Sequence, residues 1–184
     1  KYMREFNCDV VPYCIYRVGG VLLAKEKVFI SYENRILIKY TLIDAHSQTT
    51  LRFRPFLAFR DVNSLCVEND NANTTYKEVK SGISMCLYPG YPDLYMQFNK
   101  EPTFISCPTW NKGIEYSKEQ ERGYAYKEDL FVPGYFEVPI QKGESFIFSA
   151  GISEVDVDSL DDIYRDEISK STPRSSFFNC LKYS

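Results

Sequence analysis

Apolar and polar residues alternate along much of residues 12–150, and this pattern predicts β-strands. The clearest case is the segment 51–54, which reads Leu-Arg-Phe-Arg, with Leu57 and Phe59 extending its apolar odd-numbered face and Arg60 on the other side. Successive side chains of a strand point to opposite faces, so this period of two indicates one buried face. Similar runs predict strands over residues 12–18, 21–31, 36–43, 83–87, 94–98, 103–106, 135–140 and 145–150.

Polar and glycine-containing segments separate these strands. Gly19-Gly20 is a two-residue hairpin signal, and polar turns are expected at residues 32–35, 44–47, 88–93 and 141–144. Residues 61–81 are rich in Asn and Thr and are predicted to form a long surface loop. Residues 108–133 are predicted to form a second irregular region.

One helix is predicted near the C-terminus. Leu160, Ile163, Tyr164 and Ile168 recur at helical spacing within the acidic segment 157–170. Asp158 or Ser159 is expected to cap its start, Pro173 to end it, and the apolar tail 175–181 to pack on something. Many short strands and one helix predict a mostly antiparallel sandwich over residues 1–151, followed by a helical linker and tail over 152–184.

Composition narrows the classes of function. The chain has 184 residues, 44% of them hydrophobic, and is rich in Tyr (15) and Phe (13), which suits one packed β domain. A net charge of −3 gives no reason to expect nucleic acid or an anionic membrane as a partner. No segment is apolar for long enough to span a membrane, and no signal peptide is recognised. The first residue is Lys1, so the chain is expected to be part of a longer protein.

Metal, cofactor and nucleotide sites are not expected. The six Cys show no Cys-x-x-Cys spacing, and His46 is the single His. Reduced thiols in a cytoplasmic protein explain this pattern better than a disulfide framework. Gly19, Gly20 and Gly82 do not form a phosphate-binding loop before a helix. His46 lies in a polar turn, so a polar turn residue, and not a catalytic histidine, is its ordinary interpretation.

The segment 115–139, EYSKEQERGYAYKEDLFVPGYFEVP, holds the candidate chemistry. Glycoside hydrolysis uses two carboxyl groups, and Glu119, Glu121, Glu128 and Asp129 are candidates by residue type. Arg122 and Lys127 lie among them, so local ion pairing explains these carboxylates equally well. Nearby rings come from Trp110, Tyr116, Tyr124 and Tyr126, and aromatic faces stack on sugars or anchor protein interfaces. Partial burial beneath the loop is the other interpretation of Trp110.

Long runs of the sequence resemble a known family. The runs are residues 38–47 (IKYTLIDAHS), 51–61 (LRFRPFLAFRD), 121–124 (ERGY), 128–130 (EDL), Pro133-Gly134 and 149–151 (SAG). They are similar to the N-terminal domain of bacterial and archaeal-type glycogen debranching enzymes, the amylo-alpha-1,6-glucosidase relatives. The resemblance implies a galactose-mutarotase-like or glucoamylase N-terminal-domain-like β-supersandwich, here incomplete at its N-terminus. Strands absent from it are expected to leave exposed sheet edges that favour self-association.

The same resemblance implies a function without catalysis in this chain. The family's catalytic acid and base belong to a separate helical barrel, so no catalytic residue is assigned. We expect a cytoplasmic accessory domain that shapes the α-glucan or glycogen cleft and packs on the barrel of the same parent glycoside hydrolase. A stand-alone carbohydrate-binding module and a purely structural interaction domain remain as alternatives. Residues predicted to contact substrate or the barrel are Trp110, Tyr116, Glu119, Arg122, Tyr124, Glu128 and Asp129.

Overall fold

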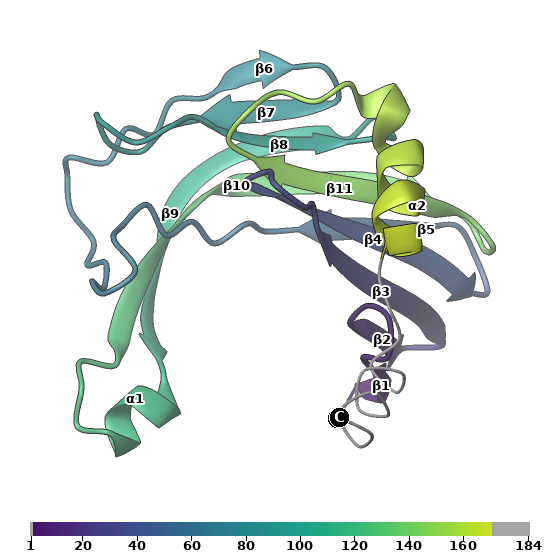
Figure 1. Ribbon diagram of the computed structural model, residues 1–184, viewed down its shortest axis with the longest axis horizontal. Helices are drawn as coiled ribbons and strands as arrows, with labels where there is room; N and C mark the ends of the chain where they lie inside the picture. The colour runs from purple at the N-terminus through teal and green to yellow at the C-terminus, as the bar shows by residue number, and fades with distance from the viewer. Residues whose placement is uncertain (1, 171–184) are drawn as a thin grey trace, which may run out of the picture.

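The computed structural model describes residues 2–170, which form a β-sandwich with a helix on one side (Figure 1). The prediction of a mostly antiparallel β fold with one C-terminal helix is confirmed. The strands are β1 (Met3–Asn7), β2 (Tyr13–Val18), β3 (Val21–Phe29), β4 (Arg35–Asp44), β5 (Thr49–Phe53), β6 (Lys77–Val79), β7 (Gly82–Met85), β8 (Leu94–Phe98), β9 (Thr103–Glu115), β10 (Lys127–Ile140) and β11 (Ser145–Gly151). The helices are α1 (Ser117–Glu121), the 3-10 turn η1 (Val157–Ser159) and α2 (Leu160–Lys170).

Two antiparallel sheets form the sandwich. The larger has the order β1-β2-β3-β4-β11-β8-β7-β6, and the smaller has the order β5-β10-β9. A hairpin joins β2 to β3 through Gly19-Gly20, as predicted. The strand β11 inserts between β4 and β8. The last strand of the described residues therefore closes the centre of the larger sheet.

The main core lies between the two sheets. Phe98 and Phe146 of the larger sheet meet Phe131 and Phe136 of the smaller, and all four side chains are almost fully buried. The rings of Phe98 and Phe136 lie 5.1 Å apart in an edge-on arrangement, a favourable geometry for aromatic pairs. The predicted apolar face of residues 51–59 is confirmed, because its members pack against this core: Leu51, Phe53, Leu57 and Phe59.

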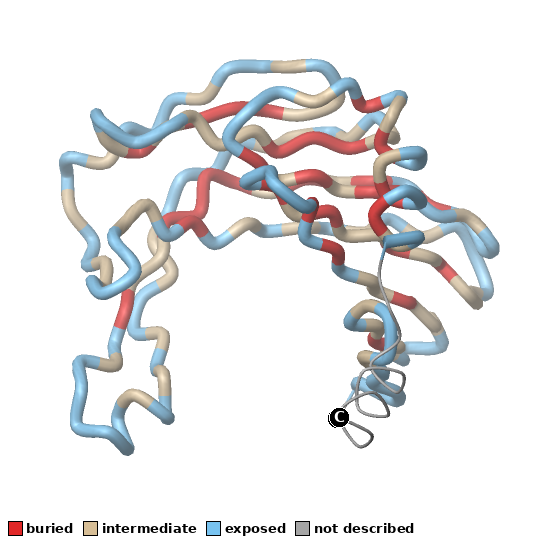
Figure 2. The backbone as a smooth tube through the Cα atoms, in the orientation of Figure 1, coloured by how far each residue is buried: buried red, intermediate tan, exposed pale blue. Residues whose placement is uncertain are grey.

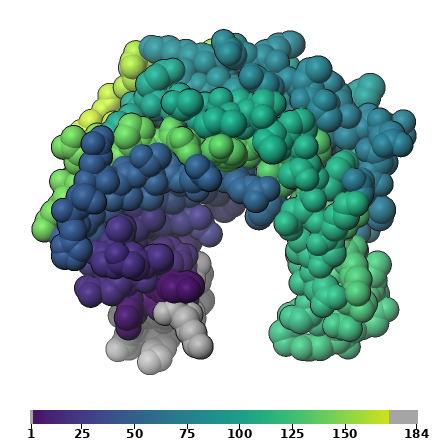
Figure 3. All heavy atoms as spheres, turned by 180° about the vertical axis from the view of Figure 1, so that it is seen from behind, coloured from purple at the N-terminus to yellow at the C-terminus, as the bar shows by residue number. Residues whose placement is uncertain are grey.

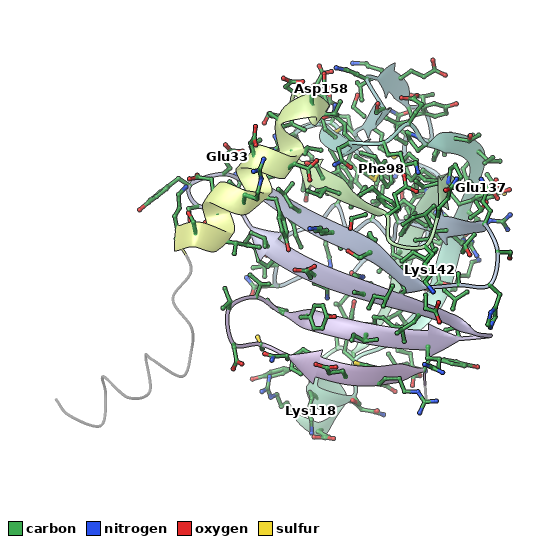
Figure 4. The ribbon with its side chains drawn as sticks, turned by 90° about the vertical axis from the view of Figure 1, so that its right-hand side faces the viewer. Glu33, Phe98, Lys118, Glu137, Lys142 and Asp158 are labelled. Atoms are coloured by element: carbon green, nitrogen blue, oxygen red, sulfur yellow. The ribbon has the colours of Figure 1, made fainter. Side chains whose placement is uncertain are left out.

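A second core lies on the opposite face of the larger sheet, where α2 packs. Leu160 and Tyr164 contact the cluster that contains Leu37 and Ile147. Tyr164 also donates a hydrogen bond from its hydroxyl to Glu26, 2.7 Å away. Figure 4 shows α2 lying across this face of the sheet. The helical periodicity was therefore a correct indicator of which side of α2 is buried.

The helix start differs from the prediction. Asp156 caps η1, because its side chain accepts a hydrogen bond from the backbone amide of Asp158. Asp158 and Ser159 already lie inside the first turn, so neither is the cap. Pro173, the tail 175–181 and Cys180 lie outside the described residues. Within residues 2–170, no helix combines the length and apolar character needed to cross a membrane.

The sequence had suggested that residues 108–133 are irregular, but most of them form strands. β9 and β10 continue as a paired ribbon far beyond the sandwich and are joined by α1 and its flanking turns. We call residues 107–132 the limb, which extends downward at the left of Figure 1. Buried residues gather in the sheets and become sparse along the limb (Figure 2). Water contacts most of the limb, so no apolar alternation revealed its strands.

Two other strands escaped prediction for a similar reason. All five residues of β1 are exposed, and β6 lies within the segment 61–81 that was expected to be a loop. Backbone pairing to a neighbouring strand defines both of them, without a buried face of their own. Together β1–β3 and the limb form the two sides of an arch, with open space between them (Figure 3).

A bulge lies where the limb leaves the sandwich. The β9–β10 register shifts between Val132 and Gly134. A Cβ atom on Gly134 would lie 2.1 Å from the carbonyl oxygen of Ile105, which is far inside contact distance. Only glycine fits this approach of the two backbones, because any side chain would push β9 away.

Candidate functional site

A hollow of about 730 Å³ lies beside the limb. One wall comes from residues 62–65, near the start of the 61–81 segment, and the other comes from the limb. Its lining includes Arg60, Tyr116, Glu119 and Tyr124, of which the last three were predicted as contact residues. We call it the limb hollow. Its volume lies within the range of small-molecule sites in proteins.

A buried ion pair lies behind the wall of the limb hollow. The side chain of Glu128 is fully buried and accepts hydrogen bonds from the guanidinium of Arg60, with Nη2 and Oε2 3.2 Å apart. It also accepts from the hydroxyl of Tyr116 at 2.5 Å and from the backbone amide of Cys66 at 3.1 Å. The network joins three segments, so it fixes where Arg60 and Tyr116 face the hollow.

The local sequence explains how these groups meet. The chain after β5 continues alongside β10, and Leu57 pairs with Phe131 through an isolated bridge. Because the two segments run antiparallel, this pairing places Arg60, three residues after Leu57, beside Glu128, three residues before Phe131. Tyr116 follows the end of β9, and its amide donates to the carbonyl of Tyr126, which closes the limb turn.

Glu128 is held in its ionised form. Burial alone raises the pKa of this carboxyl, but hydrogen bonds from Arg60, Tyr116 and the Cys66 amide outweigh it and lower the pKa below its usual value. The hydrogen bond to Glu128 in turn raises the pKa of the Tyr116 hydroxyl, which therefore remains protonated at neutral pH. Glu128 was predicted as a contact residue, and the structure places it behind the wall of the hollow.

Asp129 ties the limb to the neighbouring segment. Its carboxylate accepts from the backbone amides of Glu68 at 3.0 Å and Gly113 at 2.9 Å. These two hydrogen bonds lower the pKa of Asp129. Its own amide donates to the carbonyl of Cys66. Asp129 is not among the residues that line the limb hollow, so the structure separates it from Tyr116, Glu119 and Tyr124.

The short helix α1 carries the charged rim of the limb hollow. Arg122 and Glu119 form an exposed pair with Nη1 and Oε1 3.0 Å apart, and Lys118 pairs with Glu121 at 2.8 Å. Gly123, with a φ of +77°, ends the helix. Tyr124 follows with 66% of its surface exposed. Its ring is thus the most accessible aromatic group at the limb hollow.

Trp110 and His46 lie elsewhere. Trp110 is half-buried, and its ring packs edge-on against Phe131, with centroids 5.5 Å apart. This matches the partial burial that was one interpretation of Trp110. His46 follows β4 and is not among the residues lining the limb hollow. Among the described residues, no cluster of His, Cys, Asp and Glu has the arrangement of a metal site.

Sequence reasoning missed Arg60, Cys66 and residues 62–65 as parts of this site. Arg60 was assigned to the polar side of a strand, and nothing near it in sequence identifies its partner 68 positions later. A charged residue at the end of an apolar run was the one local signal.

The family comparison agrees with the resemblance read from the sequence. The profile of a family described as "Glycogen debranching enzyme N terminal" matches residues 1–147. No curated protein matches the chain.

Proposed function

Because the chain belongs to the family of glycogen debranching enzyme N-terminal domains, we propose that it serves such an enzyme as a non-catalytic accessory domain. In this role it shapes the α-glucan cleft and packs on the catalytic helical barrel of the same parent protein. The limb hollow carries the proposal, because it combines an exposed Tyr124 ring with hydrogen-bonding groups on a rigid support.

Binding of a glucan suits the chemistry of the limb hollow. A glucose unit presents an apolar face for a tyrosine ring and hydroxyl groups for polar side chains. Tyr124 offers the ring, while Glu119, Arg60 and Tyr116 offer polar atoms around the hollow. Glu128 holds Arg60 and Tyr116 in place through its hydrogen bonds, so part of the site is organised before a ligand arrives.

Bond cleavage in the limb hollow is not favoured by its carboxylates. A glycosidase needs a general acid whose pKa is raised so that it is protonated when the substrate binds. The pKa of Glu128 is lowered instead, and its oxygens are occupied by Arg60, Tyr116 and the Cys66 amide. Glu119 pairs with Arg122 at the surface. This arrangement supports binding and positioning, with hydrolysis left to the barrel.

A stand-alone carbohydrate-binding module is the second candidate. The exposure of Tyr124 favours it, because modules that bind sugar by themselves present accessible rings. The two candidates differ in what the isolated chain achieves. A module retains full glucan affinity alone, whereas an accessory domain gains affinity when the barrel is added.

The test is native gel electrophoresis of the chain through glycogen, with and without the separately expressed barrel. Tyr124→Ala is expected to weaken glycogen retention about tenfold. Tyr2→Ala is the matched control, because Tyr2 is 64% exposed, precedes β1 and is not among the residues that line the limb hollow. Equal retention of both variants contradicts the sugar contact. Binding to the barrel without any glycogen retention favours a purely structural domain, and hydrolysis of branched glucan by the chain alone refutes the non-catalytic role.

A further inference from the structure

One wall of the limb hollow is a loop that is fastened at both of its ends. We call residues 61–65 the wall loop, and residues 62–65 of it line the hollow. Just before the loop, Arg60 pairs with the buried carboxylate of Glu128. Just after it, the backbone amide of Cys66 donates to the same carboxylate, with N and Oε1 3.1 Å apart. Both ends of the wall loop therefore meet at one side chain of the limb.

The next residue of β10 adds a second fastening. The backbone amide of Asp129 donates to the carbonyl oxygen of Cys66 at 2.9 Å, and its Oδ2 accepts from the backbone amide of Glu68 at 3.0 Å. Its Oδ1 accepts from the backbone amide of Gly113, on the other strand of the limb, at 2.9 Å. The side chain of Asp129 thus connects the segment that follows the wall loop to both strands of the limb.

An irregularity in the limb ribbon supplies one of these amides. The register between β9 and β10 shifts between Glu128 and Leu130, and Gly113 on β9 has a φ of +67°. A bulge turns a strand locally and redirects its backbone groups, and a positive φ favours glycine. The amide that bonds to Oδ1 of Asp129 therefore belongs to a backbone shape that a regular ribbon does not have.

The contacts of Asp129 are those of a brace and not of a ligand-binding group. Each of its two carboxylate oxygens already accepts from a backbone amide, and Asp129 is not among the residues that line the limb hollow. Lys112 and Glu68 form an ion pair between the same two segments, but both side chains are exposed, and exposed pairs contribute little. The carboxylate of Asp129 is therefore the stronger connection at this end of the wall loop.

We propose that Asp129 is a positioning residue of the limb hollow, which holds the wall loop at the distance from the limb that admits a glucan chain. The inference rests on the proposed function and gives Asp129 a part in it other than contact with sugar. Without this carboxylate, the amides of Glu68 and Gly113 bond to water, and the carboxylate of Glu128 becomes the main side-chain tie of the wall loop. Glucan affinity then falls with the fraction of time for which the two walls keep their separation.

The test compares Asp129→Ala with the wild-type chain for retention by glycogen, in the native gels described above and with the barrel present. We expect a dissociation constant about fivefold higher, which corresponds to walls that keep their separation about one fifth of the time. Asp129→Asn should lie between the two, because its amide oxygen still accepts one of the two hydrogen bonds. Hydrogen–deuterium exchange at the amides of Glu68 and Gly113 should become faster in the same order.

Two control variants separate positioning from other effects. Lys112→Ala removes the exposed pair with Glu68 on the same part of the limb and is expected to bind glycogen normally. Leu160→Ala destabilises the core under α2, on the far face of the larger sheet, and is also expected to bind normally while it is folded. A loss of retention in Leu160→Ala as large as that in Asp129→Ala would assign the effect to general stability and overturn the proposal.

The outcomes also distinguish this inference from the proposed function. If Tyr124→Ala weakens retention and Asp129→Ala leaves it unchanged, the glucan contact stands and the positioning role is refuted. If the wild-type chain is not retained, or if Tyr124→Ala is retained equally well, the proposed function is refuted and the positioning role with it.

Discussion

Replacing Arg60 with Ala is expected to destabilise the chain strongly, because it removes the partner of the buried carboxylate of Glu128. The side chain of Glu128 has no exposed surface and that of Arg60 is 21% exposed. Breaking a buried ion pair by removing one partner leaves an uncompensated charge, which costs about 3 to 5 kcal/mol. Because water reaches part of Arg60, we expect a loss near the lower end. For a chain of this size, that corresponds to a fall in Tm of roughly 6 to 12 °C.

The stability lost in the Arg60→Ala chain will depend on pH. In the wild-type chain the pKa of Glu128 is lowered, so its stabilising effect is complete above the pKa of an unfolded glutamate, about 4.3, and disappears as the pH falls through the folded value. Without Arg60, Glu128 loses the strongest of the influences that lower its pKa, so this pKa is higher than in the wild-type chain. The ionised carboxylate therefore stabilises the Arg60→Ala chain less, and the difference in stability from wild type is larger at pH 7 than at pH 4.

Urea unfolding monitored by tryptophan fluorescence measures this difference. Trp110 is the single Trp and packs on Phe131 close to the ion pair, so its emission reports unfolding where the limb joins the sandwich. Arg122→Ala is the matched control, because Arg122 forms an exposed pair with Glu119 whose loss has little effect. Arg60→Met combined with Glu128→Leu should recover most of the stability. A loss below about 1 kcal/mol at pH 7, or an equal loss at both pH values, would show that Glu128 is not a buried charge.

Three further changes test the fold. Gly134→Ala should lower the free energy of unfolding by about 3 kcal/mol or more, because its Cβ would overlap the Ile105 carbonyl oxygen. Gly143→Ala, which has open space at a φ of +82°, should lower it by about 1 kcal/mol, and thermal unfolding compares the two variants. Leu160→Ala should cost about 3 kcal/mol in urea unfolding, because the side chain is fully buried between α2 and the sheet, and a negligible cost contradicts the second core. Asp129→Ala should speed hydrogen exchange at the two backbone amides that donate to it, and unchanged exchange contradicts that tie.

Burial on one face decided which strands the sequence revealed. Residues 103–106 and 135–140 lie within the sandwich, face the core on alternate positions and were predicted as strands. Their continuations into the limb belong to the same β9 and β10, but most of their positions there are exposed or half-buried and no apolar alternation appears. Backbone pairing and a few specific contacts, such as Tyr116 with Glu128, hold these parts together, and such contacts leave no periodic mark on the side-chain pattern. The helix α2 was predicted because one stripe of it is buried.

The sequence predicted the part of the candidate site whose residues lie close together along the chain. Tyr116, Glu119 and Tyr124 lie within one turn region of the limb, so any fold that projects this region brings them together. Arg60 meets Glu128 only because the chain after β5 follows β10. Which carboxylate is buried depends on that tertiary contact, and residue type alone made Glu119, Glu121 and Glu128 look equivalent.

The position of β11 at the centre of the larger sheet has a consequence for biosynthesis. Thr41 pairs with Ser145, 104 positions later, so a ribosome must deliver almost the whole domain before the middle of this sheet can close. Contacts between such distant residues make folding slow, because a long loop is closed before the contact is gained. A nascent chain that stops before β11 holds β4 and β8 apart, with the apolar residues of both strands open to chaperones or to aggregation.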